Sequence, residues 1–257
     1  MWRMITPNIL RGLLAAAIAL TTIAATQGES AESCIIEHGL QDRLGSGSAR
    51  IFVNGVYFRT EEGPGSGGGT FTDWLVEGEN EIRIEYDGDD ARFSITRGCR
   101  GAIPGDDFVD EVEFDAPGTK ILTFVHDRPV EAEYLNAEIA GNAGLADAIE
   151  SFQKAAVARD IDTIFALQAP MFRDAERLGY PVDSAKAFAR EVLTNGTTEI
   201  AESYSITPVL GGRVYQVLDA KMQSPVRVTY KAEDGTYSWS SGSYWARFDG
   251  KWGVVAQ

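Results

Sequence analysis

The spacing of apolar residues changes near residue 140, and this change limits what the chain can fold into. Before that point, short runs rich in β-branched and aromatic residues are separated by turn residues. These runs are Ala49–Phe58, Thr70–Leu75, Glu81–Tyr86, Ala91–Thr96, Val109–Phe114 and Lys120–His126. Short strands at this spacing favour a β-sandwich. Residues 34–137 are therefore predicted to form an all-β sandwich domain.

After residue 140 the apolar residues recur at helical spacing. Four of them share one face of a predicted helix: Leu145, Ile149, Phe152 and Ala156. Asp160 is expected to cap a second helix, and a third is predicted from Asp183 to Leu193, ending at Asn195-Gly196. Five strands are predicted beyond it: Glu199–Thr207, Gly212–Leu218, Val226–Lys231, Thr236–Phe248 and Lys251–Val255. Helices followed by antiparallel strands indicate an α+β domain, here residues 143–257.

The distribution of charge supports a division at the same point. Residues 34–140 carry 22 acidic and 9 basic residues, a net charge of −13, whereas residues 141–257 carry 14 and 12. Such an asymmetry, together with the Gly-Asn-Ala-Gly stretch at 141–144, predicts two domains. The acidic balance also disfavours nucleic acid as a partner.

Residues 1–25 have the layout of a secretory signal peptide. Arg3 and Arg11 precede the apolar run Leu13–Leu20, and small residues follow it, so cleavage is predicted between residues 25 and 31. The apolar run is eight residues long, whereas a membrane span needs about 20. The protein is therefore expected to be exported, periplasmic or extracellular, with no membrane association after the signal is removed.

Export determines how the two cysteines, Cys34 and Cys99, are interpreted. In an oxidising compartment two cysteines usually pair, so a Cys34–Cys99 disulfide is predicted. Closing this loop would stabilise the fold by roughly 4 kcal/mol. The alternative is a pair of free thiols, which would lack the Cys-x-x-Cys spacing typical of reactive cysteines.

Two stretches of the first half resemble the galactose-binding-like jelly rolls attached to many secreted glycosidases. They are Val53-Asn54-Gly55 and the run from Trp74 to Ile82. The resemblance implies a jelly-roll-like sandwich in which the Gly78-Glu79-Asn80 turn is a scaffold element and not a sugar contact.

Two stretches of the second half, Phe152–Leu167 and Tyr244–Val255, resemble the nuclear transport factor 2-like superfamily, which includes SnoaL-type and ketosteroid-isomerase-type proteins. The resemblance implies an α+β cone, in which a curved antiparallel sheet wraps a helix and leaves a pocket. The predicted fold is thus a jelly-roll-like β-sandwich followed by an α+β cone.

The resemblance also suggests an enzyme. Isomerases of this type use a carboxylate base and a Tyr-plus-acid pair. On this chain the resemblance places Phe152 at the tyrosine, Tyr244 at the acid, and Asp174 or Glu176 near the base. Because Phe152 has no hydroxyl, one part is missing. A cone-fold isomerase or hydrolase-like enzyme that uses Tyr244 with a carboxylate base is therefore the alternative function, and no catalytic residue is assigned.

Other candidate sites are expected to be structural, and neither a metal nor a cofactor is predicted. His38 and His126 occur without a Gly-x-Ser-x-Gly elbow. The acidic runs 85–90 and 106–111 could bind Ca²⁺ but lack the EF-hand pattern, so a turn and a solvated strand edge are expected. The glycine-rich stretch 63–69 lacks the Lys and the following helix of a phosphate-binding loop, so a mobile loop is expected.

Aromatic residues give the predicted binding site. Tyr244, Ala246 and Phe248 share one face of a strand. If that face lines the cone, a small apolar ligand would contact four residues: Phe152, Tyr204, Tyr230 and Tyr244. The alternative is that these rings fill the cone as core.

The predicted function is accordingly a non-catalytic binding or assembly protein. It would hold either a small ligand in the cone or a protein partner on the acidic first domain, with a homodimer left open.

Overall fold

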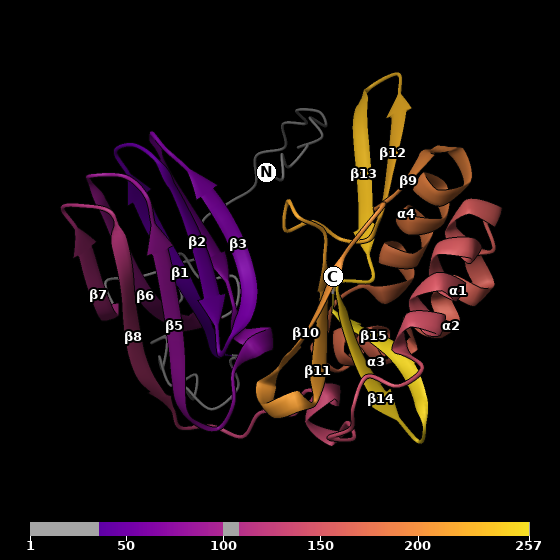
Figure 1. Ribbon diagram of the computed structural model, residues 1–257, viewed down its shortest axis with the longest axis horizontal. Coiled ribbons are helices and arrows are strands. Elements are labelled where there is room, and N and C mark those ends of the chain that lie inside the picture. Colours follow the sequence, from indigo (N-terminus) through magenta and orange to yellow (C-terminus); the bar gives the residue numbers. More distant parts are fainter. Residues whose placement is uncertain (1–35, 100–107, 257) are drawn as a thin grey trace, which may run out of the picture. The chain divides into compact units, whose positions relative to one another are not determined.

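The first half of the chain folds into two four-stranded antiparallel sheets (Figure 1). The computed structural model describes residues 36–99 and 108–256. The strands of the two sheets are β1 (Ile36–Leu44), β2 (Ser48–Val53), β3 (Val56–Glu62), β4 (Gly65–Thr70), β5 (Gly78–Tyr86), β6 (Ala91–Cys99), β7 (Phe108–Phe114) and β8 (Gly118–His126). One sheet has the order β4-β1-β6-β7 and the other has the order β3-β2-β5-β8. A short 3₁₀ helix, η1 (Thr72–Trp74), connects β4 to β5.

Alternate residues of these strands form a core between the two sheets, because side chains alternate between the faces of a strand. Leu40 and Phe93 come from one sheet and Ile51 and Ile84 from the other, and all four are buried. The run from residue 49 to 58 contains a tight turn at Asn54-Gly55, where both residues have positive φ. This turn divides the single predicted strand into β2 and β3.

The expectation of a mobile loop at the glycine-rich stretch is wrong, because residues 65–70 form β4 and pair with β1 along its length. The reason is a long-range contact. Asp42 and Arg59 form a buried ion pair beside β4. A Cβ at Gly67 would lie 3.0 Å from the Asp42 carboxylate, and one at Gly69 would lie 2.6 Å from the Arg59 guanidinium. The glycines leave room for this ion pair.

Residues Gly78-Glu79-Asn80, expected to form a turn, are the first residues of β5 and have a scaffold role. The Asn80 side chain is buried, and its Oδ1 accepts hydrogen bonds from the Val76 N–H and the Asn54 amide, both at 2.8 Å. Its Nδ2 donates to the carbonyls of Val76 and Gly78. These hydrogen bonds fix the start of β5 against the β2–β3 hairpin.

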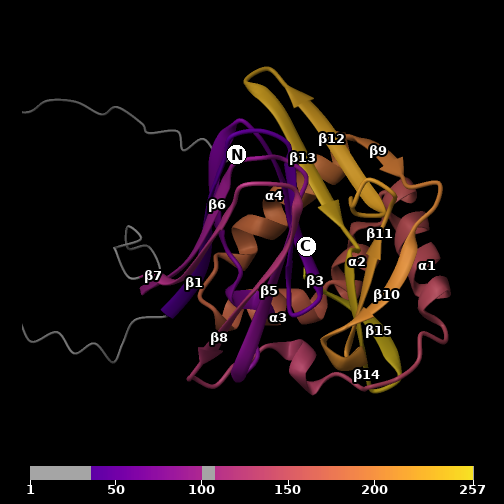
Figure 2. The same ribbon diagram turned by 60° about the vertical axis from the view of Figure 1, so that its left-hand side comes forward.

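The second half contains four helices and two antiparallel sheets within the described residues. The helices are α1 (Leu145–Ala158), α2 (Ile161–Leu167), α3 (Ala169–Arg177) and α4 (Val182–Asn195). The strands are β9 (Thr197–Ile200), β10 (Ser205–Val209), β11 (Val214–Leu218), β12 (Val226–Ala232), β13 (Gly235–Ser241), β14 (Tyr244–Phe248) and β15 (Lys251–Ala256). They form sheets of order β13-β12-β9 and β10-β11-β14-β15. Figure 2 shows the β12–β13 hairpin extending past its neighbours.

The predicted helices are confirmed where a capping residue or a stop signal in the sequence marks their ends. The Asp160 carboxylate accepts a hydrogen bond from the Thr163 N–H at 3.1 Å, which caps α2 as expected. Helix α4 ends at Asn195, before Gly196. None of the described helices combines the length and the apolar character that crossing a bilayer requires.

The predicted fold, a β-sandwich domain followed by a separate α+β cone, is wrong. The described residues form four antiparallel sheets and four α-helices, and they cluster as one compact unit. In the sheet β10-β11-β14-β15, strands β11, β14 and β15 contribute side chains to two cores, one on each face. Tyr244 and Ala246 of β14 join the core of the N-terminal sheets, whereas Trp245 between them joins a core formed with the helices. Only the β-rich character of the first half is compatible with the predicted sandwich.

The segment expected to link two domains is held firmly to both halves. The Tyr134 hydroxyl donates to the Leu75 carbonyl at 2.9 Å. The Glu138 N–H donates to the Arg247 carbonyl at 2.9 Å. Arg213 donates to backbone carbonyls of the same segment. The predicted signal peptide and Cys34 lie outside the described residues.

Candidate functional site

The four residues predicted to line one ligand site are separated between two cores. Phe152 on α1 is fully buried and belongs to the helix-side core, which the helices form with the C-terminal sheets. Tyr204 and Tyr230 are half-buried and pack against that same core, and Tyr230 stacks on Tyr237. Tyr244 lies in the other core, with the N-terminal sheets. The structure therefore does not bring the four together.

Tyr244 faces away from the helices. Its hydroxyl donates to the Tyr57 carbonyl at 2.6 Å, and its ring lies 4.6 Å from that of Trp74. Burial raises the pKa of the Tyr244 hydroxyl well above its ordinary value. Strand alternation correctly placed Tyr244 and Ala246 on one face, but that face does not contact Phe152.

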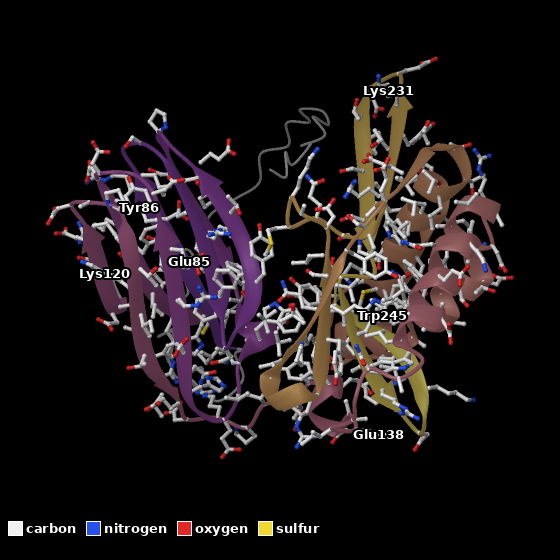
Figure 3. All side chains as sticks on the ribbon, in the orientation of Figure 1. Glu85, Tyr86, Lys120, Glu138, Lys231 and Trp245 are labelled. Atoms are coloured by element: carbon white, nitrogen blue, oxygen red, sulfur yellow. The ribbon has the colours of Figure 1, made fainter. Side chains whose placement is uncertain are left out.

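Trp245 occupies the position that the prediction gave to Tyr244. Its ring is fully buried, 5.7 Å from that of Phe152 and edge-on to it (labelled in Figure 3). Its indole N–H donates to the Gly242 carbonyl at 2.6 Å. Trp239 also packs against Phe152, with ring centres 6.2 Å apart. These three rings pack against one another as core, which is the alternative that the sequence left open.

The parts of the predicted isomerase site are not assembled. Asp174, on α3, accepts the Glu133 N–H at 2.9 Å and an Arg177 hydrogen bond at 3.0 Å. Burial raises the pKa of this carboxyl, while these hydrogen bonds act in the opposite direction. Glu176 is exposed. Asp174 thus fixes α3 to the short 3₁₀ helix Glu133–Asn136, and the Tyr244 hydroxyl is already bonded elsewhere.

The two histidines, which were expected to be structural residues, lie side by side. His38 on β1 and His126 on β8 come from different sheets, and their ring centres are 5.1 Å apart. Only 2% and 6% of the two residues is exposed. Burial lowers the pKa of His38 to about 4, with smaller contributions from His126 and Arg97, and Asp127 opposes the shift. Burial also lowers the pKa of His126.

Strand β8 carries the apolar surface that the sequence analysis missed. It pairs with β5 along nine residues and with no other strand of the described chain. Ile121 and Val125 are 54% and 68% exposed, with Thr123 between them. Glu81 and Glu79 on β5 stand directly opposite Thr123 and Val125 and are also exposed. These five residues are named the β8 surface.

The single lysine of β8 does not cover this edge. Lys120, near the margin of the N-terminal sheets in Figure 3, donates to the Glu113 carbonyl on β7 at 2.5 Å. Its ammonium also lies 5.0 Å from the centre of the Phe114 ring. Exposed edge strands are often protected by a lysine that projects from the edge. Here the lysine is bound to the neighbouring sheet, and the apolar side chains remain in solvent.

One signal in the sequence indicates this surface. The run Ile121-Leu122-Thr123-Phe124-Val125 carries β-branched or aromatic residues on both faces. A strand with a solvated outer face normally alternates apolar with polar residues. The absence of a polar face therefore marks either a strand buried on both sides or a binding edge, and only the structure distinguishes these.

Comparison with known proteins identifies no relative. No family model, no curated protein and no solved structure matches the chain. The two family resemblances therefore stay predictions.

Proposed function

We propose that this chain is an exported, non-catalytic binding or assembly protein. Its partner is an extended, basic segment of another protein that docks along the β8 surface. The observation that carries the proposal is the nine-residue edge strand β8, which exposes Ile121 and Val125 beside two carboxylates. The proposal has three supports: the free edge, its charge and the occupied candidate catalytic groups.

The first support is the free edge of β8. In an antiparallel pair, alternate N–H and C=O groups point away from the partner strand. Among the described residues, β8 has a partner only on its β5 side. An extended segment of another protein can complete these hydrogen bonds by adding one more strand. Ile121 and Val125 would then be covered by the side chains of the added strand.

Charge selects a basic segment over a second copy of the chain. Glu79 and Glu81 stand next to the exposed face of β8, within a half of net charge −13. Pairing two copies through β8 would bring both sets of carboxylates to one sheet, which is unfavourable. A segment with lysine or arginine at alternate positions is instead attracted, and its association should weaken as salt rises.

The third support is that the candidate catalytic groups are already engaged. The Tyr244 hydroxyl bonds to the Tyr57 carbonyl, and Asp174 bonds to the Glu133 N–H. A general acid or base must be within reach of a substrate proton. Both groups instead join parts of the protein to one another, which supports a non-catalytic role.

A peptide of nine residues that carries valine and lysine in turn at every second position, with threonine between them, tests this proposal, because residues two apart share one face of a strand. We expect it to bind the wild-type protein and to lose at least about tenfold in affinity to Val125→Lys. The substitution places a charge in the apolar contact and repels the lysines of the peptide. Isothermal titration calorimetry at two salt concentrations measures both the loss and the salt dependence.

The matched control is Val157→Lys, which makes the same change at an exposed residue of α1. This variant should bind the peptide as the wild type does. The same peptide with glutamate in place of each lysine should not bind. Equal affinity of Val125→Lys and Val157→Lys for the basic peptide would rule out the β8 surface. A wild-type dimer that Val125→Lys converts to a monomer would show that a second copy is the occupant.

Export and the Cys34–Cys99 disulfide are part of the same proposal. In β1 and β6, Ile36 stands opposite Cys99, and Cys34 is two residues before Ile36 in the sequence. The expected result is a mature chain that begins between residues 26 and 32 and whose thiols resist alkylation until it is reduced. Intact-mass measurement of material from the culture medium or periplasm checks both. A thiol that reacts without reduction would exclude the bridge.

A further inference from the structure

We infer that His38 and His126 together form a binding site for a divalent transition-metal ion of the kind that imidazole prefers, such as Zn²⁺ or Cu²⁺. This site is separate from the β8 surface and does not depend on the function proposed above. The two residues are the only histidines of the chain. Histidine is the commonest protein ligand for these ions.

The first argument is the state of the ring nitrogens. The Nδ1 atoms of both His38 and His126 are buried and have no hydrogen-bond partner in the structure. A buried polar atom without a partner is costly, and most such atoms in folded proteins are paired. Two of them on adjacent rings are the unusual feature here. A metal ion bound to both would give each nitrogen its missing partner.

The second argument is the distance between the rings. An imidazole nitrogen binds Zn²⁺ at about 2.0–2.1 Å, which places the ion about 3.2 Å from the ring centre. Ring centres 5.1 Å apart then correspond to an angle at the metal close to tetrahedral. The rings are nearly perpendicular, at 77°. Phe124 stacks on His38, with ring centres 5.2 Å apart, and holds that ring in place.

The surrounding charges are balanced. Asp127 follows His126 directly and is bound to Arg97 at 3.1 Å. Near His126, the negative charge of Glu77 offsets the positive charge of Arg128. No third His, Cys, Asp or Glu of the described residues completes a ligand set. Water is therefore the expected remaining ligand, and the affinity should be that of a two-histidine site rather than a closed structural one.

The test uses full-length mature protein without a histidine tag, so that every imidazole signal comes from this pair. Titration with ZnCl₂ should show one ion per chain, and His38→Gln or His126→Gln should each weaken binding by more than about tenfold. The Cu²⁺ electron paramagnetic resonance spectrum should show coupling to two nitrogens in the wild type and to one in either variant. Phe124→Leu, which disturbs the packing but keeps both ligands, should retain two.

Three results would overturn the inference. The first is no binding of Zn²⁺ or Cu²⁺ to the wild type. The second is unchanged affinity in both histidine variants, which would place the ion on the acidic surface. The third is coupling to fewer than two nitrogens in the wild-type spectrum. This last measurement needs no variant, so it decides the matter even where the histidine variants fail to fold.

Discussion

Replacing Trp74 with alanine is expected to lower the free energy of unfolding by about 3–5 kcal/mol, in one transition that includes both halves. Trp74 lies in η1 of the N-terminal half and is buried. Its ring is 4.6 Å from that of Tyr244 and 5.9 Å from that of Tyr134. Its removal leaves a cavity in the core that the two halves share, so neither half should keep its stability.

Urea unfolding followed by two probes measures this effect. Far-UV circular dichroism reports on all the sheets. Fluorescence of the variant's remaining described tryptophans, at positions 239, 245 and 252, reports on the C-terminal half alone. The two midpoints should coincide and fall together. Val157→Ala on the exposed face of α1 is the control and should change stability by less than about 0.5 kcal/mol. Separate transitions, with only the first one shifted, would show that the halves fold independently.

Lowering the pH from 7.5 to 4 is expected to lower the free energy of unfolding of the metal-free protein by about 3 kcal/mol, through protonation of His38 in the unfolded state. Its pKa is 6.5 in its ordinary state and about 4 in the folded protein. Between these values the unfolded state binds more protons than the folded state. The full contribution is therefore present above pH 6.5, and it is lost progressively as the pH falls toward 4.

The variant His38→Phe isolates this contribution, because phenylalanine keeps a ring against Phe124 and Phe71 but cannot take up a proton. The raised pKa values of Asp42, Glu61 and Asp174 act in the opposite direction. These groups bind protons more readily when folded, so they add stability as the pH falls. They are present in both proteins, and the difference between wild type and variant cancels them. Chemical unfolding from pH 4 to 7.5 with EDTA should give a difference that grows toward acid; a constant difference contradicts the prediction.

Local features of this fold could be predicted from the sequence because their causes are local. The Asp160 cap and the end of α4 before Gly196 each depend on contacts within one helical turn. The glycine-rich strand could not be predicted, because its glycines are required by distant residues. They leave room for an ion pair between Asp42 and Arg59, which lie on other strands. Composition alone makes such a stretch resemble a flexible loop.

The candidate site shows the same limit. Alternation correctly separated Tyr244 from Trp245, but alternation cannot say which face of a strand meets which neighbour. When both faces are buried, as in β14, the polar side that normally marks the outside is missing. The pairing of His38 with His126 depends on how two sheets stack, and no spacing in the sequence encodes it.

The burial of β14 and β15 on both faces also affects folding during synthesis of the chain. Val255 of β15, the last described strand to be made, lies in the core that contains Leu40 of β1, the first. The N-terminal sheets therefore present an open apolar surface until β15 has been delivered. Contacts between such distant parts of a chain form slowly. Until β15 has been synthesised, this apolar surface of the nascent chain must stay unfolded or be shielded by a chaperone.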